Sequence, residues 1–80
     1  LPAQKFNSIV INPPIRAGKK VIYAMFDGAH DYLIDGGSLF IVIRKSHGAP
    51  SAASYIANRF GQCELLEKDK GFYIYQAVKK

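Results

Sequence analysis

The fold of this 80-residue chain is decided by one stretch, Ile9-Val10-Ile11-Asn12-Pro13-Pro14-Ile15. Its three consecutive β-branched residues predict a strand over residues 6–12 that is buried on both faces. Pro13 and Pro14 end that strand, because neither has an N–H to donate to a neighbouring strand. Asn12 precedes a proline and is therefore held in extended geometry. The stretch predicts a carboxamide held by a rigid turn at the tip of a strand.

The other elements are predicted from hydrophobic periodicity and from turn residues. Apolar residues spaced by three and four indicate a helix over residues 19–33, which the glycines at 36–37 end: Ile22, Met25, Phe26, Ala29 and Leu33. Further elements are expected as strand 39–43, buried on both faces, helix 50–60, strand 63–68, a turn at 69–71 and strand 72–78. The second helix is expected to turn four residues inward, Ala53, Ile56, Ala57 and Phe60.

Strands that alternate with helices predict an α/β fold with a mostly parallel sheet and one antiparallel closing strand. Ligands of such sheets bind beyond the carboxyl ends of the strands. Asn12 and residues 44–48 follow two of these ends and are expected to share one rim. The first strand has a neighbour on one side only, so its other edge would be bare. We therefore expect the 80 residues to be a piece of a larger α/β domain, or to need a partner that covers this edge.

Composition narrows the range of partners. Eleven Lys and Arg against six acidic residues give a net charge of +5, which favours a polyanion such as nucleic acid. Cys63 is the only cysteine, so a disulfide framework or a zinc site built from several cysteines is excluded, and a cytoplasmic location is expected. No apolar run approaches the ~20 residues that span a bilayer, so no membrane partner is expected. No metal site is predicted either.

Four blocks of sequence carry a family resemblance: Asn-Pro-Pro-Ile-Arg-Ala-Gly-Lys at 12–19, Asp-Gly-Gly-Ser-Leu at 35–39, Gly-Ala-Pro-Ser at 48–51 and Lys-Asp-Lys-Gly-Phe-Tyr at 68–73. Through them the whole chain resembles the methyltransferase small-domain family of class I S-adenosylmethionine-dependent methyltransferases. Within that family it looks most like the small-subunit ribosomal RNA guanine-N2 methyltransferases. The resemblance implies the C-terminal half of a Rossmann-like seven-stranded sheet, whose last strand inserts antiparallel between the fifth and the sixth.

The resemblance also implies what residues 1–80 lack. The N-terminal, cofactor-binding half of such a catalytic domain carries a glycine-rich loop and an acidic residue for the S-adenosylmethionine ribose. Gly36-Gly37 is expected to stop a helix and does not open a GxGxxG loop. The chain alone is therefore expected to be inactive, as a part of an enzyme that methylates RNA, with small-subunit ribosomal RNA as the expected partner.

The implied site follows the Asn-Pro-Pro motif. The Asn12 side chain and the Pro13 carbonyl would accept hydrogen bonds from the target amino group, and Asn12 would also contact the cofactor. Substrate-binding residues would be Pro14, Ile15, Arg16, Gly18, Lys19, Lys20, Arg44 and Lys45. The alternative for Asn12 is a turn asparagine that caps the following backbone, and the alternative for the basic residues is an ordinary solvated loop.

Several alternatives stay open. Ile15 stands where related motifs have a base-stacking aromatic residue, which disfavours protein glutamine or DNA adenine as the target of a methyltransferase. A non-enzymatic α/β module that binds nucleic acid would use the same basic residues. His47 could act as a base, whereas His30 is expected on the helix surface. Core packing is expected for Cys63, Tyr73 and Tyr75, with base stacking the alternative for the two tyrosines and Phe72.

Overall fold

A computed structural model describes residues 6–79, apart from the side chains of Ile15 and His47. In chain order the elements are β1 (Phe6–Ile11), a 3₁₀ turn (Ile15–Ala17), α1 (Lys19–Tyr32), β2 (Leu33–Arg44), a second 3₁₀ turn (Lys45–His47), α2 (Ala49–Phe60), β3 (Glu64–Asp69) and β4 (Phe72–Val78). Neither helix is both long and apolar enough to cross a membrane, as judged over the described residues. The order of elements is the one that the sequence predicts.

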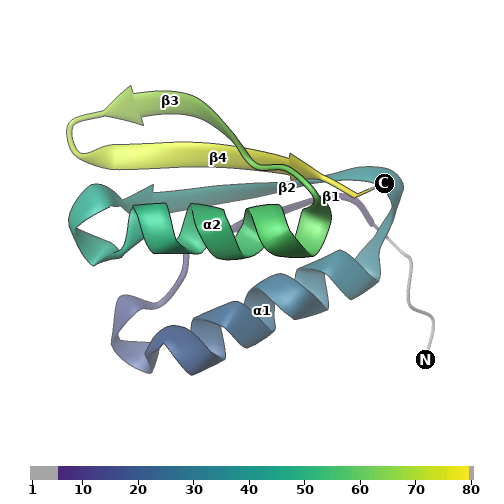
Figure 1. Ribbon diagram of the computed structural model, residues 1–80, viewed down its shortest axis with the longest axis horizontal. Coiled ribbons are helices and arrows are strands. Elements are labelled where there is room, and N and C mark those ends of the chain that lie inside the picture. Colours follow the sequence, from purple (N-terminus) through teal and green to yellow (C-terminus); the bar gives the residue numbers. More distant parts are fainter. Residues whose placement is uncertain (1–5, 80) are drawn as a thin grey trace.

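The four strands form one mixed sheet in the order β1-β2-β4-β3. β1 runs parallel to β2, and β4 runs antiparallel to both of its neighbours. β1, β2 and β3 therefore point the same way, and their carboxyl ends meet at one edge. Both helices cover the same face of the sheet (Figure 1). The α/β class and the antiparallel insertion of the last strand are confirmed.

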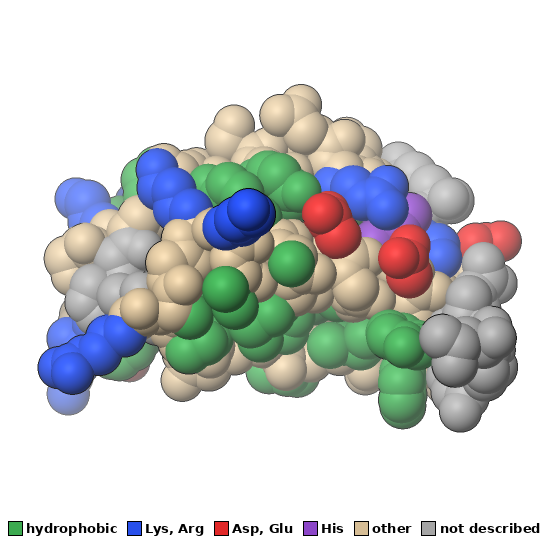
Figure 2. All heavy atoms as spheres, turned by 90° about the horizontal axis from the view of Figure 1, so that it is seen from below, with side chains coloured by type: hydrophobic (Ala, Val, Ile, Leu, Met, Phe, Trp, Pro, Cys, Tyr) green, Lys and Arg blue, Asp and Glu red, His purple; other side chains and the backbone are tan. Residues whose placement is uncertain are grey.

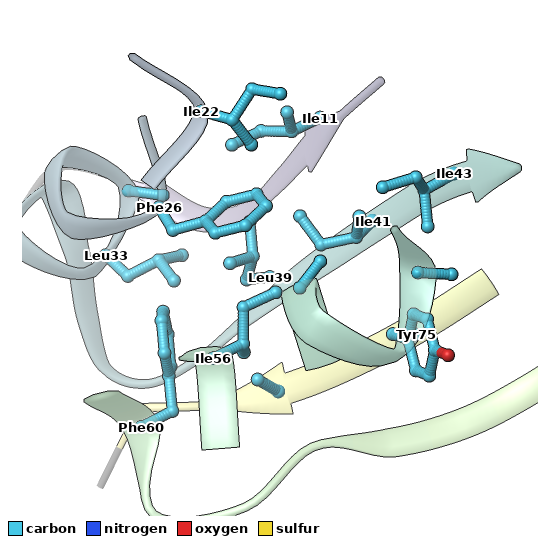
Figure 3. Packing of buried hydrophobic residues seen from close by; sticks show 14 residues of the cluster. Ile11, Ile22, Phe26, Leu33, Leu39, Ile41, Ile43, Ile56, Phe60 and Tyr75 are labelled. Carbon is cyan, nitrogen blue, oxygen red and sulfur yellow. The ribbon is translucent and has the colours of Figure 1, made fainter. Parts of the chain in front are cut away.

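The core lies between this face and the two helices. Leu39, Ile41 and Ile43 alternate along β2 toward the helices and are at most 3% exposed. Figure 3 shows Phe26 of α1 and Ile56 of α2 packing onto these strand residues. The buried side chains of the helices are Ile22, Phe26 and Ala29 in α1 and Ala49, Ala52, Ile56 and Phe60 in α2.

The predictions of inward-facing residues are only partly confirmed. Met25 is 37% exposed, because the buried stripe of α1 runs along positions 22, 26 and 29. In α2, Ile56 and Phe60 are buried as predicted and Ala53 packs against the core while half-buried, but Ala57 is only half-buried and Ala52 is buried instead. The buried face of α2 therefore follows positions 49, 52, 56 and 60, one residue round from the predicted face.

The opposite face of the sheet and the free edge of β1 remain uncovered by the described residues. Val10 is 69% exposed and Phe6 49% exposed, although both belong to a strongly apolar strand. On β2, Phe40 and Val42 point to this open face and are half-buried. The predicted burial of β1 and β2 on both faces is therefore not met within this chain, whereas the predicted bare edge is present.

The glycine pair at 36–37 lies within β2 and does not stop a helix. α1 ends at Tyr32. Its C-cap is Leu33, which has extended geometry and donates its N–H to the carbonyl of Ala29. Backbone hydrogen bonds join both glycines to Lys79, from the Gly36 N–H at 2.6 Å and to the Gly37 carbonyl at 2.8 Å. A Cβ on Gly37 would lie 3.0 Å from the carbonyl oxygen of Asn7, so the glycine lets β1 approach. The predicted helix stop is wrong because these backbone groups are paired.

A two-residue turn joins β3 to β4. Lys70 and Gly71 both have positive φ, 48° and 86°, as a tight turn matched to strand twist requires. The Lys45 N–H donates to the carbonyl of Gly71 at 2.8 Å, so the segment that follows β2 is fastened to this hairpin. The predicted hairpin is confirmed.

Candidate functional site

The carboxyl ends of β1 and β2 meet at the rim where the sequence places a site. Ile11 pairs with Ile41 in the parallel register, so Asn12 follows β1 at nearly the level at which β2 ends in Arg44. The turn at 45–47 and the start of both helices lie at the same rim (Figure 1). The structure thus brings together the two segments that topology predicted to be neighbours.

The turn after Asn12 is held from both sides. Pro13 is buried, and the Ala17 N–H donates to the carbonyl of Pro14 at 2.9 Å, which closes one 3₁₀ turn. Gly18 then begins α1 with φ +88°, a conformation that side-chain-bearing residues rarely adopt. Its carbonyl accepts from the Ile22 N–H at 3.1 Å. Asn12 is therefore fixed between a paired strand and a helix start, although its own side chain is exposed.

The polar groups at this tip have no hydrogen-bond partners among the described parts of residues 6–79, which leave out the side chains of Ile15 and His47. No bond to or from the Asn12 carboxamide is present, and none to the Pro13 carbonyl. The structure therefore gives no support to the alternative in which Asn12 caps the following backbone. Two acceptor oxygens stand at the end of β1, one on a side chain and one on the main chain.

Basic residues surround this tip and define what we call the basic rim: Arg16, Lys19, Lys20, Arg44 and Lys45. All five are exposed. Within the described part of the chain, none of them forms an ion pair with a carboxylate. Figure 2, seen from the helix side, shows Lys and Arg side chains gathered at the left end, where the strands point. The rim is thus a positively charged surface whose cations are not neutralised by neighbours.

Other predicted residues lie away from the rim or outside the described side chains. The side chains of Ile15 and His47, for which the sequence suggests an apolar wall and a base, lie outside the described part of the chain. Tyr75 is buried and Tyr73 packs against the core, which supports packing rather than base stacking. Cys63 also packs against the core, and burial raises the pKa of its thiol to about 11. It stays a protonated, unreactive thiol at neutral pH.

His30 is not the helix-surface residue that the sequence suggests. Its side chain is only 21% exposed, and its ring packs edge-on against Phe60 with centroids 4.8 Å apart. Burial and the positive charges of Arg59 and Lys79 lower its pKa. His30 lies near the C-terminal ends of the two helices, whereas the basic rim lies where the helices begin, so it takes no part in the site.

Sequence reasoning missed two cations of the same edge. Lys68 lies near the end of β3 and Lys70 in the turn that follows it, and β3 points the same way as β1 and β2. Both side chains are exposed. The signal was available, because a strand parallel to the first two must end at their rim.

The residues present fit a small part of an S-adenosylmethionine site. Asn12 offers an exposed, unpartnered carboxamide at the carboxyl end of a strand, where ligands of α/β sheets bind. The sequence holds no GxGxxG, and its one glycine pair lies inside β2 at the far end of the sheet. The region that would hold most of the cofactor is therefore not in this chain.

Comparison with known proteins now decides the family. The methyltransferase small domain family matches residues 1–76. This chain belongs to that family. A Bacillus subtilis (strain 168) protein named YbxB, described as uncharacterized, is 48% identical over 77 residues, covering 96% of this chain and 38% of that protein. The ribosomal RNA small subunit methyltransferase C of Vibrio cholerae is 31% identical and covers 92% of this chain and 22% of its own length.

The fold of this family member also matches a solved methyltransferase. A Thermus thermophilus 16S rRNA N2 G1207 methyltransferase (RsmC), solved with AdoMet and guanosine, superimposes on 98% of the chain with a TM-score of 0.92 at 18% identity. The match covers 21% of that structure. The fold is therefore the C-terminal part of a class I methyltransferase, and the chain spans between 20% and 38% of the relatives' lengths.

Proposed function

We propose that this chain is the substrate-side part of an S-adenosylmethionine-dependent methyltransferase that modifies guanine N2 in ribosomal RNA in the cytoplasm. The observation that carries the proposal is Asn12, exposed and unpartnered at the carboxyl end of β1 inside a fixed turn. The basic rim beside it suits a phosphate backbone. Similarity to ribosomal RNA methyltransferases supports the RNA substrate.

The chemistry explains why two acceptors belong there. An exocyclic amino nitrogen is a poor nucleophile because its lone pair is delocalised into the ring. Acceptors placed on the two amino hydrogens favour a pyramidal nitrogen and aim its lone pair at the incoming methyl group. The Asn12 side-chain oxygen and the Pro13 carbonyl supply two such acceptors, and Pro13 and Pro14 bring no competing N–H. When bound, S-adenosylmethionine supplies the methyl group from its sulfonium.

These residues act by position and electrostatics and form no covalent bond to the substrate. A preorganised acceptor costs no reorganisation when charge develops on the amino group. The turn that carries Asn12 is braced by the buried Pro13 and by the Ala17-to-Pro14 hydrogen bond, which fixes the backbone from which the carboxamide and the Pro13 carbonyl project. The basic rim would hold the RNA so that one base reaches this tip.

The proposal includes the rest of a catalytic domain. Residues 1–80 would form its C-terminal part, and an N-terminal half would hold the cofactor and lie against the free edge of β1. The position of β1 at the edge of the sheet supports this arrangement, and the exposure of Val10, which points to the open face with Phe40, fits a half that also covers this face. The relatives, which are several times longer than this chain, provide room for such a half.

The test is methyl transfer by the full-length protein. Labelled S-adenosylmethionine is supplied with unmodified ribosomal RNA, and the digested RNA is analysed for N2-methylguanosine. We expect incorporation, and we expect Asn12→Ala to lower the single-turnover rate by roughly 10²–10³, the scale for one preorganised polar contact. Binding of S-adenosylmethionine, measured by calorimetry, should weaken far less than the rate falls, because Asn12 would make one contact to the cofactor and the N-terminal half would make the others.

Three results would overturn parts of the proposal. Absence of any affinity for S-adenosylmethionine would favour a nucleic-acid-binding module without enzymatic activity. A methylated base other than guanine, or a methyl group on another guanine atom, would keep the enzyme and reject the N2 target. A near-wild-type rate for Asn12→Ala would reject the role of the carboxamide.

A further inference from the structure

The hairpin between β3 and β4 carries the charge of the rim beyond the proposed site. Its exposed lysines, Lys68 and Lys70, lie at the edge where the strands of the basic rim end. With the basic rim they make seven of the eleven Lys and Arg of the chain, and Asp69 is the one acidic residue in these segments. The net positive charge of the molecule is thus concentrated along a single edge.

Contacts within the structure fasten this hairpin to the rim. The Lys45 N–H donates to the carbonyl of Gly71 at 2.8 Å, so the backbone after β2 and the turn after β3 move together. The Arg44 guanidinium lies over the ring of Phe72 with 4.5 Å to the centroid. A stacked guanidinium keeps its edge N–H groups free, and these fit phosphate oxygens. The hairpin is therefore held to the part of the basic rim that follows β2, which carries Arg44 and Lys45.

The cations stand on both sides of the sheet edge. Lys68 pairs across the sheet with Tyr73, which packs against the core, so it lies on the helix side; its Nζ is 5.5 Å from the Tyr73 ring centroid. Arg44 pairs with Phe72, the next residue, and lies on the open side. Within residues 6–79, neither hairpin lysine is paired with a carboxylate. A polyanion crossing the edge meets positive charge on either side.

We propose that the β3–β4 hairpin, through Lys68 and Lys70, is a second RNA-backbone contact that holds the strand flanking the target base. This inference rests on the proposed function, because Asn12 fixes where the target base sits. β1 and β3 are three strand spacings apart, or about 14 Å at ~4.8 Å each. A stacked strand rises ~3.4 Å per nucleotide, so the hairpin meets phosphates about four nucleotides from the target.

The experiment compares long and short RNA substrates of the full-length protein. The variant is Lys68→Gln with Lys70→Gln, which removes charge and keeps side-chain length. For a 20-nucleotide RNA with one central guanine, we expect the slope of log affinity against log salt to fall by up to ~1.4, at ~0.7 per phosphate. For guanosine, or for an RNA with two nucleotides on each side of the guanine, methylation should match wild type.

Two single variants serve as matched controls. Asp69→Asn removes the acidic residue between the two lysines, and we expect it to tighten binding of the 20-nucleotide RNA. Arg59→Gln removes a cation that lies near the end of α2 and is paired with acids, and we expect no change in the salt slope. If Asp69→Asn tightens RNA binding and the double lysine variant weakens it, then the charge of the hairpin governs binding, and a change in its fold does not.

The outcomes separate this inference from the function on which it rests. Wild-type methylation with an unchanged salt slope in the lysine variant would overturn the hairpin contact and leave the function standing. Equal losses on the 20-nucleotide RNA and on guanosine would also overturn it, because the hairpin would then be acting on the structure of the site. RNA binding with the expected slope change but without methyl transfer would support the contact and reject the enzyme.

Discussion

Charged side chains are unpaired at one end of the molecule and paired with one another toward the other end. Where the strands end, the basic rim is exposed and makes no ion pairs within the described residues. Toward the end where the helices finish, Asp27 accepts from the Tyr55 hydroxyl at 2.8 and 2.9 Å and from Arg59 at 3.2 Å. Charge that is paired inside the chain holds α1 against α2. Charge that is left unpaired at the rim is available to a ligand.

Neutralising the rim should produce the largest effect. The triple variant Arg16→Gln, Lys19→Gln and Lys20→Gln in the full-length protein should flatten the salt dependence of RNA binding by up to ~2 log units per log unit of salt. That is about a hundredfold over a tenfold salt range. The free energy of unfolding, measured by denaturant titration, should stay within about 0.5 kcal/mol of wild type, because exposed unpaired cations contribute little to folding. An unchanged slope would mean an ordinary solvated loop.

Removing Asp27 should have the converse effect. Asp27→Ala leaves the Tyr55 hydroxyl without its acceptor and takes one carboxylate from Arg59, so we expect a loss of about 1–2 kcal/mol in the free energy of unfolding. Asp31→Ala is the matched control: it lies one turn on, is 64% exposed and touches Arg59 only at 3.5 Å, so it should cost under ~1 kcal/mol.

Both variants at the paired end should leave RNA binding unchanged. Fluorescence anisotropy with the same RNA measures this, and denaturant unfolding measures the stability. A drop in RNA affinity for Asp27→Ala at a temperature where the protein stays folded would show that the two ends are coupled. Equal destabilisation by Asp27→Ala and Asp31→Ala would assign the effect to charge alone and not to the Tyr55 hydrogen bond.

The smallest effect concerns pH and His30. Its lowered pKa, caused by burial and by the Arg59 and Lys79 charges, means that the folded state prefers the neutral ring. The folded protein therefore binds fewer protons than the unfolded chain, and stability falls as the pH drops below the ordinary value near 6.5. Asp31 and Asp27 oppose this shift in part. We expect a decline below ~1.4 kcal/mol per pH unit, the limit for one proton.

His30→Gln should flatten the decline in stability between pH 7 and pH 5. The measurement is the unfolding midpoint of the wild type and the variant at each pH. A parallel decline in both proteins would assign the pH dependence to other groups. A decline toward high pH in the wild type would contradict the direction of the shift.

The sequence predicted the rim because strand ends follow from local chemistry. A few adjacent residues determine each of three features: the end of β1 at the prolines after Asn12, the helix starts, and the turn at Lys70-Gly71. The structure has all three. The position of β4 between β2 and β3 is different. A hairpin alone could pair with β2 through either of its strands, so this order came from the family resemblance and not from the pattern of residues.

The misplaced features depend on partners distant in sequence. Gly36 and Gly37 resemble a helix stop until the backbone of Lys79 is known to pair with both. Lys79 is only 7% exposed, and its Nζ donates to the Leu33 carbonyl at 2.9 Å, a burial that no local rule predicts for lysine. His30 is similar, since the Phe60 ring that covers it lies in the other helix. Tertiary contacts overrode local preference at each of these positions.

The antiparallel direction of β4 also has a topological consequence. β1 begins, and β4 finishes, at the same end of the sheet, opposite the rim. Polypeptide joined to either end is therefore attached behind the site, and its attachment does not cross the path of a substrate. A sheet that finished on a parallel strand would release its chain into the site. The rim is therefore kept clear of the chain's own connections, whatever the length of polypeptide that is joined behind it.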